Sequence, residues 1–203
     1  SDTVAIGRNA FQGDGSTAPT GNCNIAIGNY SLDAATSAHS NVSIGYQSAT
    51  AVTTANQNVA IGMQALATED QGGNTVAVGY QALQDQNVNS ANNTAVGSKA
   101  GLNLTSGTNN AIFGYNAVGI GVATGSNNSV FGKSAGYSLT SGNANVLIGL
   151  DAGYNLTNNT HNIAIGYASL DAATGDEHYN IAIGTNTLGT ENSNAGGGVA
   201  IGH

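Results

Sequence analysis

The chain has 203 residues, a net charge of −8 and three basic residues against eleven acidic ones. Binding along nucleic acid is excluded, because neutralising phosphates takes clustered cations. An anionic membrane surface is disfavoured for the same reason, and no apolar run approaches the roughly 18 residues that span a bilayer. The single Cys23 cannot form a disulfide within the chain, and no Cys/His spacing suggests zinc, so we expect no cofactor.

One short phrase, apolar–small–apolar–Gly, recurs from end to end of the chain, usually after Asn. Its first copies read VAIG, IAIG, VSIG and VAIG. The twelve copies occupy residues 4–7, 25–28, 42–45, 59–62, 76–79, 94–97, 111–114, 129–132, 146–149, 163–166, 181–184 and 199–202. Successive glycines are 17 or 18 residues apart, except for a first gap of 21 that predicts a longer loop around Pro19.

This period predicts a β-solenoid. Helical repeats run to about 33–47 residues and propeller blades to about 40–50, so both are too long. No break in composition divides the chain, and we therefore predict a single all-β domain over residues 1–203, a parallel β-roll of about twelve 17–18-residue coils. At about 4.8 Å per coil, the rod would be about 55–60 Å long.

The repeat also predicts which side chains fill the core. Side chains alternate along a strand, so we expect the first and third residues of each copy, mostly Val or Ile, to face inward. Further apolar positions lie four residues after the glycine, as at Leu66 and Leu83, and seven after it, as at Leu104 and Leu139. A single coil cannot bury these residues, but stacked coils share a continuous core.

The middle residue of each copy should then point away from the interior. This column is apolar in eleven of the twelve copies and never charged. Exposed along a rod, it would form a larger apolar patch than soluble monomers usually show. We therefore predict a subunit interface with these candidate contacts: Ala60, Ala77, Ala95, Ile112, Val130 and Leu147. The alternative is that loops of the same coil cover the column.

Two recurring polar signals have structural interpretations. The invariant glycine predicts a positive φ or a close backbone approach at a corner, whereas a phosphate loop would need a following helix and Lys. Asn lies four residues before the glycine in nine copies, which predicts a hydrogen-bonded amide ladder. The calcium-binding nonapeptide of β-rolls is absent, so we expect no metal site.

Thr recurs eight residues after the glycine, at Thr36, Thr53, Thr105, Thr140, Thr157 and Thr174. A regular hydroxyl column could order water, as in ice-binding proteins. The alternative, which we favour for a single interrupted column, is a ladder at a turn or strand edge.

Tyrosines recur at two other coil positions and are our candidate surface contacts. They are Tyr46, Tyr80, Tyr115 and Tyr167, directly after the glycine, and Tyr137 and Tyr154, five residues after it. Exposed aromatic rings can hold sugars, and the alternative is that the rings pack on the surface of the rod.

Catalysis has little support in the sequence, and we expect no enzymatic activity. The adjacent acids Glu69 and Asp70, and likewise Asp176 and Glu177, lie in predicted loops without an identifiable second partner, so a glycosidase pair cannot be assigned. The four histidines do not fall into one column. A carboxylate pair formed between two chains is the remaining alternative.

The motif Asn-x-Ala-Ile-Gly resembles the head repeats of trimeric autotransporter adhesins of the Yersinia-adhesin type. The stretch NVAIGMQAL at residues 58–66 resembles repeats of bacteriophage tail fibres. The resemblance covers essentially the whole chain and implies a left-handed parallel β-roll assembled as a parallel homotrimer. Adhesin heads have shorter repeats and are followed by a stalk, so the larger coil here favours a virion fibre or a free filament.

We therefore expect a non-catalytic, extracellular or virion structural protein that forms a fibre, with attachment to a surface as an added role. The chain begins and ends on a copy of the motif, which predicts open strand edges. We expect these edges to stack head to tail into longer rods, or to continue into further domains in the native protein. The alternative function is a sugar-binding adhesin head with a cell-surface glycan as partner. An ice-binding protein and a polysaccharide-degrading tailspike are weaker alternatives.

Overall fold

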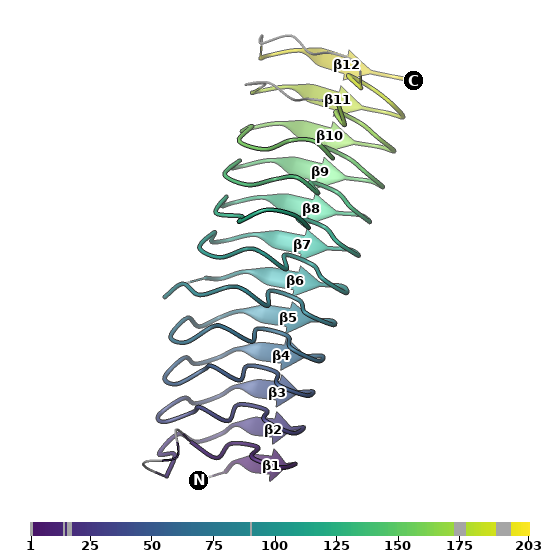
Figure 1. The fold of residues 1–203 in the computed structure, drawn as a ribbon. Helices are drawn as coiled ribbons and strands as arrows, with labels where there is room; N and C mark the ends of the chain where they lie inside the picture. The colour runs from purple at the N-terminus through teal and green to yellow at the C-terminus, as the bar shows by residue number, and fades with distance from the viewer. Residues whose placement is uncertain (1, 14, 16–17, 90, 173–177, 190–195) are drawn as a thin grey trace.

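The computed structural model describes residues 2–13, 15, 18–89, 91–172, 178–189 and 196–203. These residues form one sheet of twelve parallel strands in sequence order and contain no helix (Figure 1). The strands are β1 (Val4–Ile6), β2 (Ile25–Ile27), β3 (Val42–Ile44), β4 (Val59–Ile61), β5 (Val76–Val78), β6 (Thr94–Val96), β7 (Ala111–Phe113), β8 (Ser129–Phe131), β9 (Val146–Ile148), β10 (Ile163–Ile165), β11 (Ile181–Ile183) and β12 (Val199–Ile201). The predicted β-solenoid is confirmed.

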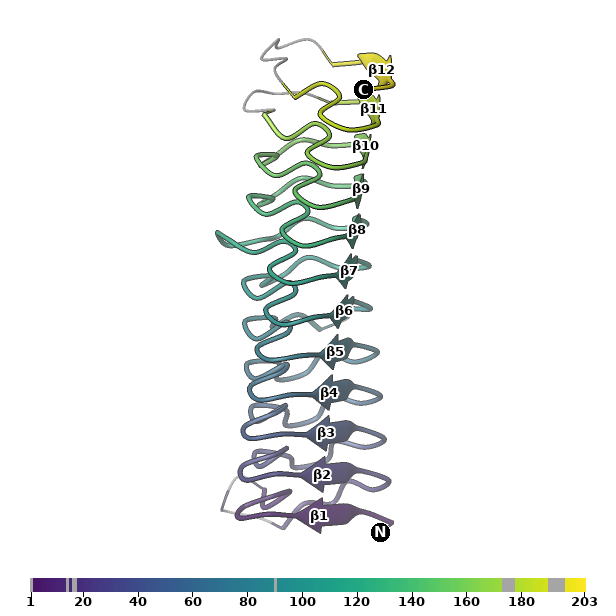
Figure 2. The ribbon, with the colours of Figure 1, turned by 90° about the vertical axis from the view of Figure 1, so that its right-hand side faces the viewer.

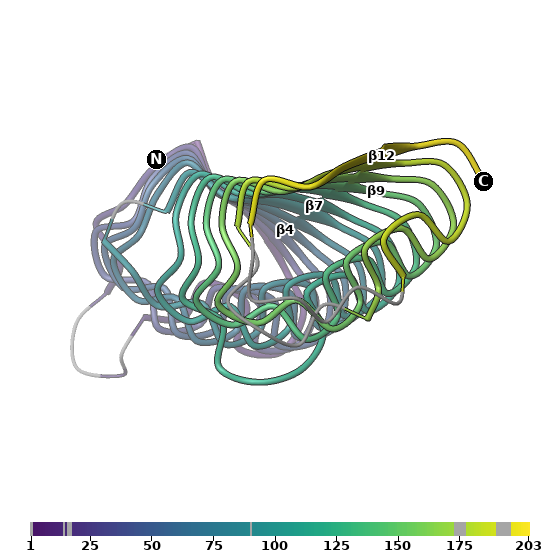
Figure 3. The same ribbon diagram turned by 90° about the horizontal axis from the view of Figure 1, so that it is seen from above.

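Each coil contributes one strand and returns through turns on the opposite side of the rod (Figure 2). Seen from the C-terminal end, the chain winds clockwise as it approaches the viewer, so the solenoid is left-handed (Figure 3). The same view shows each coil rotated slightly against the one below, as the twist of parallel strands requires. Pairing joins equivalent residues, for example Ala60 with Ala77.

The central residue of each strand from β2 to β11 faces the interior, which is the reverse of our prediction. From β2 to β11 this side chain is at most 1% exposed. The residues predicted as a subunit interface are therefore buried inside their own coils, and that prediction is wrong for all six: Ala60, Ala77, Ala95, Ile112, Val130 and Leu147.

The space available inside the coil explains why the strand faces are reversed. Alternation shows which strand residues share a face, but it does not show which face is inside. Each coil also sends a turn residue inward, such as Leu66 or Leu83, both fully buried. Opposite these leucines there is room for the small central residue, so the larger first and third residues point outward.

The turn positions predicted for the core are confirmed by Leu32, Leu66, Leu104, Leu139 and Leu156, which are at most 2% exposed. The two positions also compensate for each other. Coils with Leu at the first position have a small or polar residue at the second, whereas three coils have the opposite arrangement: Gly101 with Leu104, Gly136 with Leu139, and Gly153 with Leu156. A Cβ on Gly153 would lie 2.8 Å from side-chain carbons of both Leu147 and Leu156. The glycine thus leaves the space that these two leucines fill, and the total side-chain volume inside the coil stays nearly constant.

The glycine that ends each strand lies against the backbone of the next coil. Gly149 has a φ of +136°, and a Cβ there would lie 2.3 Å from the carbonyl oxygen of Gly166. The predicted role of this column is thus confirmed on both counts, since positive φ and close approach occur together. Gly202 has a similar φ of +143° but no atom within 4 Å of its added Cβ.

We predict that Gly149→Ala lowers the free energy of unfolding by about 2–4 kcal/mol, because it adds a steric clash to backbone strain. Gly202→Ala is the matched control, because it keeps the strain and lacks the clash. Urea unfolding followed by circular dichroism measures both variants. Equal losses would contradict the close-approach argument.

Candidate functional surfaces

The outer face of the sheet consists of the first and third residues of every strand. The first-residue column is Val4, Ile25, Val42, Val59, Val76, Thr94, Ala111, Ser129, Val146, Ile163, Ile181 and Val199. The third-residue column is Ile6, Ile27, Ile44, Ile61, Val78, Val96, Phe113, Phe131, Ile148, Ile165, Ile183 and Ile201. All of these side chains are at least partly exposed, and Phe113 and Phe131 stack with ring centroids 4.7 Å apart.

This outer face is an apolar stripe two residues wide that follows the whole sheet. Its only polar members are Thr94 and Ser129, and none is charged. Soluble monomers rarely expose so long a contiguous apolar surface. Its chemistry suits packing against another apolar surface. The alternating pattern of the strands predicted these side chains for the core, so an apolar outer face was not expected.

Beside the outer face runs a ridge formed by the residues that directly follow the strand-ending glycines. Four of the six tyrosines predicted as surface contacts lie on it and are 41–50% exposed: Tyr46, Tyr80, Tyr115 and Tyr167. Met63 and Leu150 hold the same position in other coils and are 43% and 41% exposed. The ridge therefore presents large side chains to solvent at coil spacing.

The other two predicted contacts, Tyr137 and Tyr154, belong to the turns. Their rings stack on each other, with centroids 4.8 Å apart and an angle of 21° between the planes. Gly119 lies against Tyr137, since a Cβ there would be 2.7 Å from the ring. Both tyrosines are partly buried, which supports the packing interpretation for this pair.

The predicted asparagine ladder is confirmed and lies inside the rod. The backbone N–H of Asn41 donates to Oδ1 of Asn24 at 3.0 Å, and that of Asn58 donates to Oδ1 of Asn41 at 2.9 Å. The side-chain amide of Asn41 also donates to the carbonyl oxygen of Ala55 at 2.9 Å. These amides satisfy backbone groups of neighbouring coils and are buried, so they stabilise the stack.

The ladder is interrupted at Thr75, where a buried acid and amide complete the hydrogen bonding. Glu69 is fully buried, and its carboxylate accepts the Gly72 backbone N–H at 2.7 Å and the Gln86 side-chain amide at 2.9 Å. Gln86 also donates to the Thr75 hydroxyl at 3.1 Å and accepts from the Asn93 amide at 2.8 Å. The sequence marked Glu69 only as a loop acid.

The threonine column forms a ladder between coils. The Thr36 hydroxyl donates to the carbonyl oxygen of Thr53 at 3.1 Å, and that of Thr140 donates to the carbonyl oxygen of Thr157 at 3.2 Å. Their donors are thus used within the rod, which favours the ladder interpretation over water ordering. Thr174 lies outside the described residues.

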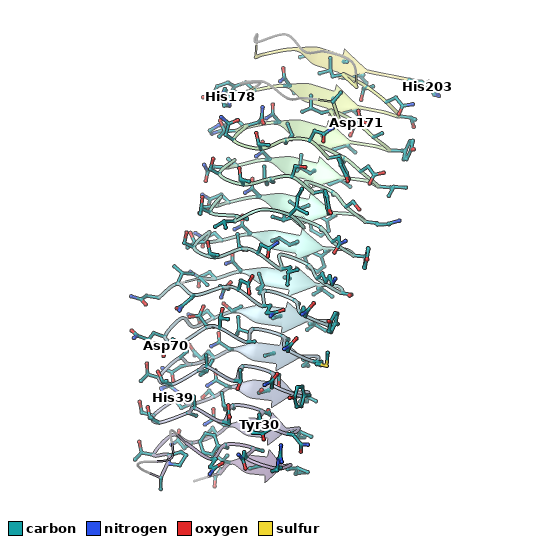
Figure 4. The ribbon with its side chains drawn as sticks, viewed as in Figure 1. Tyr30, His39, Asp70, Asp171, His178 and His203 are labelled. Carbon is teal, nitrogen blue, oxygen red and sulfur yellow. The ribbon has the colours of Figure 1, made fainter. Side chains whose placement is uncertain are left out.

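The remaining titratable side chains are spread along the rod, as the labelled examples in Figure 4 show. Burial raises the pKa of Asp171, and the negative charge of Asp151 on the neighbouring coil adds to this effect. His39 and His178 occupy equivalent positions, but eight coils separate them. Within the described part of the chain, no three His, Cys, Asp or Glu residues gather where a metal ion could be held.

The acidic pairs considered for catalysis do not make a described site. Asp70 accepts a hydrogen bond from the Thr53 hydroxyl, while Glu69 is inside the core. Asp176 and Glu177 lie outside the described residues.

No family model, curated protein or solved structure matches the chain. The described residues form no helix that is long and apolar enough to cross a membrane. The candidate surfaces therefore depend on the geometry of this chain alone.

We predict that Glu69→Gln lowers the free energy of unfolding by about 1–3 kcal/mol, because the new side chain keeps one acceptor oxygen and its NH₂ group would face the donor of either Gly72 or Gln86. Asp85→Asn, the same change at a partly exposed acid, is the control and should have little effect. Urea unfolding at neutral pH compares the two. Similar losses would show that the buried network does not depend on the carboxylate.

Proposed function

We propose that this chain is a non-catalytic structural protein that builds an elongated fibre on a virion or a cell surface. The observation that carries the proposal is the outer face, an uncharged apolar stripe along the whole sheet. The filled interior of the middle coils supports it. The cavity near Ile112 and Leu139 measures about 10 Å³, which is room for about one water molecule.

The proposed assembly is a parallel homotrimer in which three copies pack their outer faces around an axis. A second copy in parallel offers an apolar stripe of the same length with the same coil spacing, so coil can meet coil along the rod. Val and Ile have stiff, branched side chains that pack well in such an interface. The number three comes from the resemblance to trimeric β-roll repeats.

This assembly replaces the interface suggested by the sequence. The central strand residues are enclosed in their own coils, whereas the outer face is the apolar surface that a single chain leaves uncovered. Burying it would remove the largest apolar exposure of the sheet from water, and this hydrophobic gain would drive association.

We predict a mass of about 60 kDa by light scattering in dilute solution, three times the 20.0 kDa of one chain. Ile61→Asp should reduce this mass while leaving the circular dichroism spectrum unchanged, because like charges would meet in the interface and the side chain points outward. Ser106→Asp adds the same charge at an exposed turn residue and is the control.

Two results would contradict the assembly. A 20 kDa particle for the unmodified chain would exclude the trimer, and undiminished mass of Ile61→Asp would exclude this face as its interface. Ala95→Glu should instead unfold the coil, because Ala95 is fully buried within it.

A further inference from the structure

Three successive coils, those of β3, β4 and β5, carry two neighbouring columns of side chains, one of large apolar residues and one of amides. One is a segment of the ridge, Tyr46, Met63 and Tyr80. The other consists of the residues that follow them, Gln47, Gln64 and Gln81, which we call the glutamine ladder. The residues of the two columns are the first and second after each strand-ending glycine, so both columns lie beside the outer face.

The glutamine ladder is ordered by hydrogen bonds from coil to coil. The Gln64 amide donates to Oε1 of Gln47 at 3.3 Å, and the Gln81 amide donates to Oε1 of Gln64 at 3.1 Å. The backbone fixes the two columns together, since the N–H of Gln64 donates to the carbonyl oxygen of Tyr46 at 2.9 Å. All three glutamines have a φ of +54° to +57° and are partly exposed.

The ladder retains capacity for a ligand. A side-chain amide has two N–H donors and an acceptor oxygen, and the ladder takes one donor each from Gln64 and Gln81. Both donors of Gln47 and the oxygen of Gln81 are outside these two bonds. A row of amides is therefore held at coil spacing with polar atoms at a partly solvated surface.

The other column consists of two tyrosines and a methionine at coil spacing. Tyr46 and Tyr80 are 46% and 41% exposed and lie two coils apart, about 9.6 Å at the spacing of parallel strands, with Met63 between them. Tyr30 contacts Tyr46 edge to face, with ring centroids 6.2 Å apart. The rings thus provide spaced apolar contacts next to an amide row.

We propose that this surface binds a linear, uncharged, β-1,4-linked glycan that lies along the rod. A pyranose ring has apolar C–H faces and a rim of hydroxyls, which match large apolar side chains and amides respectively. An extended β-1,4 chain advances per sugar by a distance close to the coil spacing of about 4.8 Å, so successive sugars meet successive coils. None of the six side chains is charged, which suits a neutral ligand.

This inference goes beyond the fibre proposal and does not depend on it. The chain would hold sugars on the ridge and the glutamine ladder, which lie beside the outer face that the assembly uses and share no residue with it. The tyrosines at Tyr115 and Tyr167 provide an internal comparison. Both are 50% exposed on the same ridge, but they are followed by Asn116 and Ala168 and have no glutamine ladder beside them.

Calorimetric titration of the purified chain with cellohexaose and chitohexaose tests the proposal, and maltohexaose is the control for linkage. We expect at least one β-1,4 probe to bind and maltohexaose to bind at least about tenfold more weakly. The double variant Tyr46→Ala/Tyr80→Ala should weaken binding at least about tenfold, as loss of aromatic anchors does. Gln64→Leu, which interrupts the ladder, should also weaken it.

The matched control is Tyr115→Ala/Tyr167→Ala, which removes two rings that are slightly more exposed than Tyr46 and Tyr80 and should leave the affinity unchanged. Circular dichroism and light scattering confirm that each variant keeps the fold and mass of the unmodified chain. No binding of either β-1,4 probe, equal binding of maltohexaose, or an equal loss in the control pair would overturn the proposal. None of these results would bear on self-association, which the outer-face variants test separately.

Discussion

The structure depends on how closely one coil lies on the next. Parallel strands are about 4.8 Å apart, and at the end of each strand the carbonyl of one glycine occupies the space where a Cβ of its neighbour would be. Only glycine combines this approach with a φ near +130° without strain. The glycine column therefore allows every other column of the rod to stack at hydrogen-bonding distance.

Uniform stacking requires that every coil has the same cross-section. The core keeps it the same because a large side chain at one core position is combined with a small one at another. Leu66 with the small Ala60 fills one coil, while Leu156 with Leu147 and Gly153 fills another. Interiors are packed nearly as densely as crystals, so a larger residue at one position needs a smaller one beside it. Each coil can thus vary in sequence while it presents the same outline to its neighbours.

The same spacing turns recurring polar residues into ladders. Inside the rod, Asn24, Asn41 and Asn58 satisfy backbone groups of adjacent coils, and Glu69 with Gln86 restores this bonding where Thr75 replaces the asparagine. On the surface, the repeat places equivalent side chains in columns, which form the apolar outer face and the glutamine ladder. A one-dimensional stack therefore creates long binding surfaces from very few residue types.

The sequence by itself determined the period, the all-β class, the glycine corners, the asparagine ladder and the leucines of the turns, because these signals repeat at one position per coil. It did not determine which side of the strand is inside. The pattern Val-Ala-Ile allows either assignment by alternation alone. The volume left by the leucine of the following turn, Leu66, decided that Ala60 points inward and Ile61 outward. The sequence does combine the large central residue Leu147 with a glycine, Gly153, in the same coil. Only the structure shows that these two residues are in contact inside the coil, so that one must be small when the other is large. Likewise, the burial of Glu69 and the order of the glutamine ladder arise from stacking, which brings residues 17 positions apart into contact.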